Sequence, residues 1–86
     1  MKIDAKITRM LVSEKVKAYA SICIDEGFVI YGIKIISGEK GTFIAMPTRK
    51  SRRGSYYDIC FPISTEARKK IETAVMEAYQ EKLKEI

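Results

Sequence analysis

The chain has 86 residues, a formal net charge of +5 and 47% hydrophobic residues, which are the proportions of one small globular domain spanning residues 1–86. No apolar run approaches the ~20 residues that cross a bilayer, and the first residues lack the apolar stretch of a secretory signal. These features exclude an inserted membrane protein, a multidomain enzyme and a secreted precursor. They predict a cytoplasmic location.

The chain contains two cysteines, Cys23 and Cys60, and no histidine. A zinc finger needs four clustered Cys or His ligands, and a Ser-His or Cys-His nucleophile needs an imidazole base, so both site types are excluded. No pair of carboxylates is spaced for acid–base or metal chemistry. We therefore expect neither an enzyme nor a bound cofactor or metal. In a reducing compartment the two cysteines are expected to be small buried residues rather than a disulfide.

Alternation of apolar and polar residues with period two predicts a series of β-strands in the first two thirds of the chain. Residues 28–36 are rich in β-branched and aromatic side chains, so this strand is expected to be buried on both faces and to lie at the centre of the sheet or at an interface. Gly27, in the turn before it, is expected to adopt a positive φ, and Pro47 is expected to end the following strand. The predicted strands cover residues 2–12, 16–24, 28–36, 42–46 and 55–61.

The period changes to three or four residues from Ser64 onward, which predicts one amphipathic helix over residues 64–86. Ser64 is the expected N-cap, and Glu66 lies in the first turn, where the helix dipole favours an acid. The expected apolar stripe comprises Ile71, Val75, Ala78, Tyr79, Leu83 and Ile86. The fold class is therefore α+β, with an antiparallel sheet of about five strands followed by one long C-terminal amphipathic helix.

Most of the excess positive charge lies in one short window, residues 49–53, which contains Arg49, Lys50, Arg52 and Arg53 and no acidic residue. The predicted strands 42–46 and 55–61 flank this window, so the loop from Thr48 to Gly54 is expected at the tip of a hairpin. A dense cationic cluster on a rigid scaffold is typical of polyanion binding. The alternative is a solvated loop without a partner.

The residues of the window suit a nucleic acid in particular. Arginine offers a planar fork of donors that fits phosphate and the guanine edge, and aromatic rings stack on unpaired bases. Tyr57 is expected to pack on the sheet. A small basic patch at the helix start, Arg68 to Lys70, is the rival location for nucleic-acid contacts. Without such a contact, this patch is simply a solvated face of the helix. The candidate nucleic-acid-binding residues are Thr48, Arg49, Lys50, Ser51, Arg52, Arg53 and Tyr56.

Two segments resemble the SpoVG family of bacterial proteins. The first runs from Phe28 to the stretch Phe43-Ile44-Ala45-Met46-Pro47 and is followed, as in the family, by basic residues. The second runs from Asp58-Ile59 through Pro62-Ile63 to Tyr79. The two segments together cover nearly the whole chain.

This resemblance implies a small homodimer that binds DNA and RNA site-preferentially and is linked to division-septum formation and, in spore formers, to sporulation. It assigns nucleic-acid contacts to Arg49 and Lys50, whereas Arg52 and Arg53 stand where relatives are often less basic. Phe61 replaces a histidine that relatives often carry, so any role of that histidine is lost. The chain ends without the polar tail of many relatives, which puts tail-dependent contacts in doubt.

Homodimerisation also has a physical motive, since a strand that is apolar on both faces needs more cover than one helix gives, and a free sheet edge offers unpaired backbone groups. The main alternative function is a protein-interaction module of the cell-division machinery, in which the basic loop meets an acidic protein surface and nucleic-acid affinity is incidental. An anionic membrane surface is a weaker option, because no large apolar residues are interleaved with the basic ones.

Overall fold

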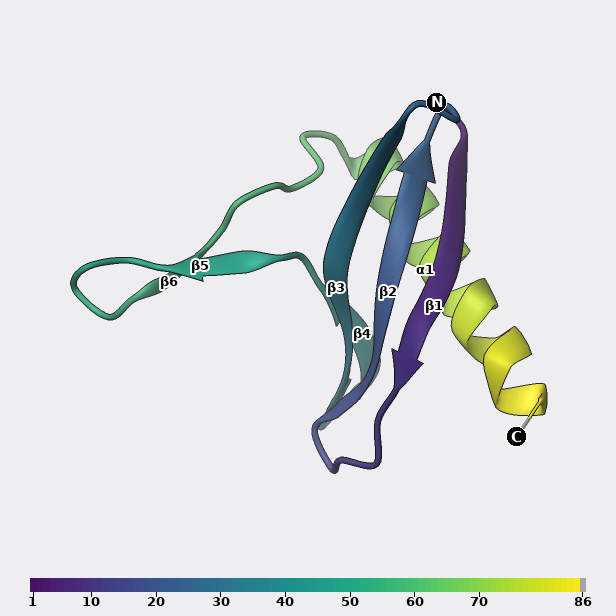
Figure 1. Cartoon of the computed structure of the whole chain (residues 1–86), viewed down its shortest axis with the longest axis horizontal. Coiled ribbons are helices and arrows are strands. Elements are labelled where there is room, and N and C mark those ends of the chain that lie inside the picture. Colours follow the sequence, from purple (N-terminus) through teal and green to yellow (C-terminus); the bar gives the residue numbers. More distant parts are fainter. Residues whose placement is uncertain (86) are drawn as a thin grey trace.

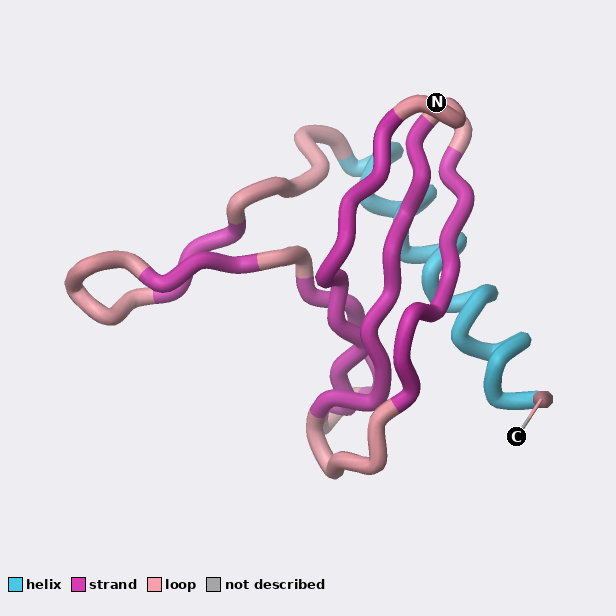
Figure 2. Tube along the Cα trace, viewed as in Figure 1, coloured by secondary structure: helices cyan, strands magenta, loops and turns pink. Residues whose placement is uncertain are grey.

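A computed structural model describes residues 1–85 of the chain. It contains a four-stranded antiparallel sheet in the order β1-β2-β3-β4, a separate two-stranded hairpin formed by β5 and β6, and the C-terminal helix α1 (Figure 1). The predicted α+β class is thus confirmed. Figure 2 shows which parts of the chain are helix, strand and loop. The elements are β1 Ile3–Met10, β2 Val16–Ile24, β3 Phe28–Gly38, β4 Gly41–Ala45, β5 Thr48–Lys50, β6 Tyr56–Asp58 and α1 Thr65–Lys84.

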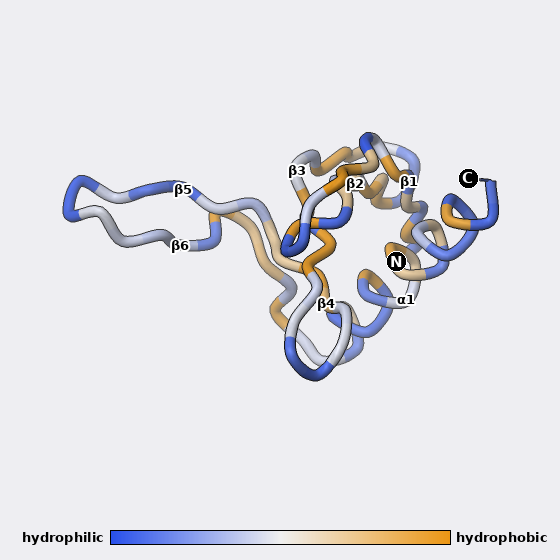
Figure 3. The backbone as a smooth tube through the Cα atoms, turned by 90° about the horizontal axis from the view of Figure 1, so that it is seen from below, coloured by the Kyte–Doolittle hydropathy of each residue, from blue (hydrophilic) through white to orange (hydrophobic). Residues whose placement is uncertain are grey.

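The helix covers one face of the four-stranded sheet, and the core lies between these two layers (Figure 3). Side chains that alternate along β2 and β3 point toward α1, which follows from the period-two pattern of these strands. Ile71, Val75 and Tyr79 of the predicted stripe are buried, Leu83 is 41% exposed, and Ile86 lies outside the described residues. The buried apolar residues are Ala18, Ala20, Ile22, Ile33, Ile35, Met46, Ile71, Val75 and Tyr79.

Three register shifts interrupt the pairing in the sheet. The register between β1 and β2 shifts between Ile7 and Arg9. The register between β2 and β3 shifts between Val16 and Ala18 and again between Ala20 and Ile22, where Gly32 of β3 has φ +86°. On the N-terminal side of Gly32, β3 pairs with β2 but not with β4, because β4 pairs only with residues 34–38 of β3. Among the described residues, the outer edge of β3 from Phe28 to Gly32 therefore has no hydrogen-bonded strand beside it.

The turn between β2 and β3 corrects one prediction. Asp25 and Glu26 adopt positive φ values of 49° and 59°, whereas Gly27 does not. Two successive positive φ angles are those of a type I′ turn, which matches the twist of the two strands. Lys2 contacts this turn, since its Nζ lies 2.7 Å from Glu26 Oε1. That hydrogen bond, together with the charge of Asp4, raises the pKa of Lys2.

Three further predictions differ from the structure. Strand β3 is not buried on both faces, because Val29 and Tyr31 on the face away from α1 are 48% and 71% exposed and no second layer formed by residues 1–85 covers them. The expected fifth strand over 55–61 shortens to β6 and leaves the sheet, as described below. Cys23 and Cys60 are free thiols as expected, but both are half-buried rather than fully buried.

Helix α1 begins as predicted. Ser64 has extended dihedral angles, and its Oγ accepts a hydrogen bond of 3.1 Å from the backbone N–H of Ala67. Within residues 1–85 no helix combines the length and the apolar character that crossing a bilayer requires.

We expect Ser64→Ala to lower the free energy of unfolding by about 1 kcal/mol, because the N–H of Ala67 loses its acceptor at the helix end. Urea unfolding followed by circular dichroism measures this change. Thr65→Ala is the matched control, since it removes a neighbouring exposed hydroxyl and should leave the midpoint unchanged or slightly raised. Equal midpoints for Ser64→Ala and the unsubstituted protein would show that the cap contributes nothing.

Candidate nucleic-acid interface

The basic window lies on a hairpin that projects sideways from the sheet, and residues 48–58 are called the arm below (Figure 1). In residues 1–85, β5 and β6 contact each other but no other strand or helix. The base of the arm is closed by a hydrogen bond of 3.0 Å from the N–H of Ile59 to the carbonyl oxygen of Pro47. The arm is thus a separate unit attached to the sheet after Met46, which is itself buried in the core.

The arm differs from the predicted hairpin in its strands. Residues 42–46 were expected to pair with residues 55–61, but β4 stays in the main sheet and the arm forms its own strands, β5 and β6. Pro47 interrupts the ladder after β4 because proline has no backbone N–H to donate. The structure consequently places Thr48, Arg49 and Lys50 in a strand and leaves only residues 51–55 in the turn.

Internal hydrogen bonds define the conformation of this turn. The N–H of Ser51 donates to the carbonyl oxygen of Ser55 at 2.7 Å, and the N–H of Gly54 donates to the carbonyl oxygen of Ser51 at 3.0 Å. The Oγ of Ser51 accepts from the N–H of Ser55 at 3.2 Å. Gly54 has φ +88°, a value that a residue with a side chain adopts only with strain. Arg52 and Arg53 lie at the tip of this turn and are exposed.

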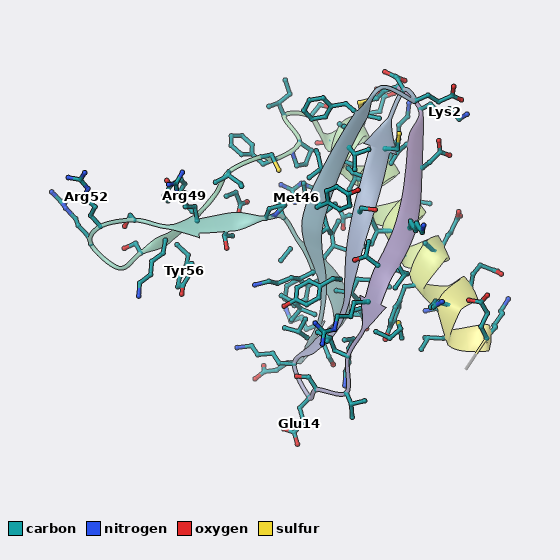
Figure 4. The ribbon with its side chains drawn as sticks, in the orientation of Figure 1. Lys2, Glu14, Met46, Arg49, Arg52 and Tyr56 are labelled. Atoms are coloured by element: carbon teal, nitrogen blue, oxygen red, sulfur yellow. The ribbon has the colours of Figure 1, made fainter. Side chains whose placement is uncertain are left out.

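The register of the arm gives each of its two faces one cation and one tyrosine. Arg49 is paired with Tyr57, and Lys50 is paired with Tyr56. Figure 4 shows Arg49 and Tyr56 pointing to opposite sides of the arm. Tyr57 is 50% exposed and does not pack on the main sheet, so the prediction for this residue is wrong. The sequence-based candidate set missed it, although its alternation with Tyr56 is visible once β5 and β6 are aligned.

The arm carries positive charge that no carboxylate of residues 1–85 pairs with. All five ion pairs among residues 1–85 involve other cations, namely Lys2, Lys70, Lys82 and Lys84. Asp58, the one acidic residue of the arm, lies at its base opposite Thr48. The hydrophilic tip lies far from the apolar core (Figure 3). A polyanion that approaches the arm therefore meets four free cations on an accessible support.

The rival basic patch at the start of α1 is less concentrated. Lys70 forms an ion pair with Glu66 at 3.8 Å, and its Nζ also donates to the carbonyl oxygen of Met1 at 3.3 Å. Arg68 and Lys69 remain exposed on the helix. Within the described residues no group of three Cys, Asp or Glu side chains is placed to hold a metal ion.

Comparison with known proteins identifies the family. The sequence profile described as SpoVG matches residues 1–81. The chain belongs to the SpoVG family. A relative from Lachnospira eligens is 48% identical over 77 residues, which cover 90% of this chain and 88% of the relative.

Two further SpoVG relatives are similar over almost their entire length. The protein from Clostridium beijerinckii is 45% identical over 95% of this chain and 90% of the relative, and the protein from Archaeoglobus fulgidus is 45% identical over 91% and 92%. All three bear the name "Putative septation protein SpoVG". The resemblance inferred from the residues is thus confirmed, and the name of these SpoVG proteins refers to septation rather than to an enzymatic activity.

Proposed function

We propose that this SpoVG-family protein is a regulatory protein that binds DNA or RNA site-preferentially through its arm. The observation that carries the proposal is the set of four arm cations, Arg49, Lys50, Arg52 and Arg53, none of which forms an ion pair within residues 1–85. A link to division-septum formation follows from the name of the relatives, and a link to sporulation in spore formers follows from the family resemblance.

The chemistry of the arm suits a nucleic-acid backbone. Arg52 and Arg53 at the tip present forked donors to phosphate oxygens, while Lys50 acts as a point charge. The hydroxyl of Thr48 adds a donor at the base. Tyr56 is 70% exposed and offers a ring face to an unpaired base. The Oγ of Ser51 accepts from the N–H of Ser55 and still has its own proton to donate to a phosphate.

A homodimer is part of the proposal, because a single arm makes few contacts and two linked arms raise the affinity by avidity. The free edge of β3 supports such an assembly. Apolar side chains lie exposed near this edge and on the segment that returns from the arm to α1: Phe28 is 65%, Phe61 61% and Ile63 92% exposed. Covering them with a second copy removes apolar surface from water.

A salt titration tests the proposed function. Affinity for duplex DNA, single-stranded DNA and RNA is measured side by side between low and moderate salt, while light scattering gives the number of copies. Four phosphate contacts per arm give a slope of log K against log[salt] of roughly −3 to −4 for duplex DNA, and a dimer that engages both arms doubles it. A slope near zero, or no binding to any of the three at low salt, contradicts the proposal.

A protein-interaction module of the division machinery is the second candidate function. The exposed Ile59, Phe61 and Ile63 beside the arm favour it, since apolar side chains suit a protein partner better than a phosphate backbone. Purification of partners before and after nuclease treatment separates the two functions. A contact that survives nuclease is made by protein, whereas one that nuclease removes is made through nucleic acid.

A further inference from the structure

We propose that the outer face of the main sheet, the face opposite α1, is a second binding surface and that its ligand is unpaired nucleic acid. This inference rests on the proposed function, because it extends the arm into a longer interface. It depends on the strand register, which places cations and tyrosines from separate strands side by side.

One row of residues crosses three strands. Arg9 of β1 is paired with Tyr19 of β2, and Tyr19 is paired with Lys34 of β3. Tyr19 lies between Ala18 and Ala20, both of which are fully buried on the α1 side, so the row lies on the outer face. Neighbouring strands are ~4.8 Å apart, so the row spans about 10 Å and carries a cation at each end with a ring between them.

A second row lies beside the first. Lys6 of β1 is paired with Ser21 of β2, and Tyr31 of β3 lies next to the bulge opposite Ser21. Tyr31 is 71% exposed. Lys6, Arg9 and Lys34 form no ion pair within residues 1–85. Asp4 lies at the end of the face, where its Oδ2 is 3.9 Å from the Nζ of Lys2. The centre of the face therefore combines free positive charge with two tyrosine rings.

This combination favours unpaired over paired nucleic acid. Tyrosine rings on a sheet stack on bases whose faces are free, and a duplex keeps its base faces covered by neighbouring base pairs. The flanking cations neutralise the phosphates between successive bases. Exposed apolar side chains on the same face, such as Val29 and Phe43, add surface that suits the faces of bases.

The outer face also leads to the arm. The row continues from Lys34 to its partner Ala45 in β4, and the arm begins three residues later at Thr48. Figure 1 shows that the arm extends on the side of β3 and β4, away from β1. A single nucleic-acid strand that lies across the sheet from β1 to β4 therefore reaches the base of the arm. Arg49 is the first arm cation on this path.

The test uses two variants and an oligomer of deoxythymidine 20 nucleotides long as the probe. The chain contains no tryptophan, so Tyr31→Trp introduces a single fluorescent reporter at an exposed position. We expect the oligomer to quench its fluorescence by stacking. We expect Arg9→Ser combined with Lys34→Ser to weaken binding of the oligomer at least about tenfold at 50 mM salt and to reduce the salt slope by about 1.4.

Arg68→Ser combined with Lys69→Ser is the matched control, because it also removes one Arg and one Lys, but from exposed positions of α1. We expect this control to change oligomer binding less than threefold. Equal losses for the two double variants, or unchanged Trp fluorescence at a saturating oligomer concentration, would overturn the proposal. If the outer-face proposal fails in this way but replacing the four arm cations still abolishes duplex binding, the proposed function stays intact. If the oligomer still quenches Tyr31→Trp fluorescence in a protein without the arm cations, the outer face binds the oligomer independently of the arm. Circular dichroism is used to check that each variant is folded.

Discussion

Replacing Arg49, Lys50, Arg52 and Arg53 together by alanine is expected to reduce the affinity for duplex DNA more than about 10³-fold at 50 mM salt. The reason is that four phosphate contacts, and the release of the counterions that accompanies them, are lost at once, which changes the salt slope by about 3.6 per arm. A filter-binding or gel-shift titration measures the loss. Binding of single-stranded DNA should fall less, because the outer face of the sheet remains.

The fold should survive this change. The four side chains are exposed, and the arm contacts no other strand or helix within residues 1–85, so no core contact is removed. The thermal midpoint should therefore match that of the unsubstituted protein. A control variant with alanine at Lys15, Lys40, Arg68 and Lys69 loses the same formal charge from scattered exposed positions and should keep most of its affinity. A folded arm variant that shifts duplex DNA at the original concentration would refute the assignment of the arm.

Ile35→Ala should have the largest effect on stability. Ile35 is fully buried in β3, and its removal leaves a cavity beneath α1. Substitutions of this kind cost about 2–5 kcal/mol, a large part of the roughly 4–13 kcal/mol available to a domain of this size. Each kcal/mol shifts the thermal midpoint of such a domain by about 4–8 °C, so we expect a loss of more than about 10 °C.

Val12→Ala is the matched control for the core substitution, because Val12 lies fully exposed between β1 and β2 and its loss should leave the midpoint within about 1 °C. Both variants are compared with the original chain at one protein concentration, since self-association would make the midpoint depend on concentration. A midpoint for Ile35→Ala within a few degrees of the original would contradict the position of the core.

The inward-facing residues of β2 and the helix could be predicted because each of these two elements follows one period. Ala18, Ala20 and Ile22 alternate strictly, and the helix begins directly after Ser64, a residue that caps well. The departure of the arm could not be predicted, because residues 55–61 alternate in the same way whichever strand they pair with. Pro47 indicates where the ladder stops, but not where the next one begins.

The candidate site was predictable in its charge but not in its geometry. Clustering of four cations within five positions is visible in the printed sequence, whereas the pairing of Arg49 with Tyr57 depends on the register. The outer face depends on a bulge. Strict alternation from Ile7 would point Arg9 toward the core, and the register shift between these two residues turns Arg9 to the opposite face, beside Tyr19. A prediction from strict alternation misses such a shift, because it assumes that each residue of one strand has one partner in the next.

The isolation of the arm from the rest of the chain has a consequence for how such proteins diversify. Since residues 48–58 contact neither the four-stranded sheet nor α1, exchanging or lengthening them does not require compensating changes among the buried residues. Mutation and selection can therefore vary the residues of the arm without removing contacts that stabilise the domain. For the same reason, a foreign hairpin grafted between Pro47 and Ile59 would be carried by a scaffold that does not depend on it.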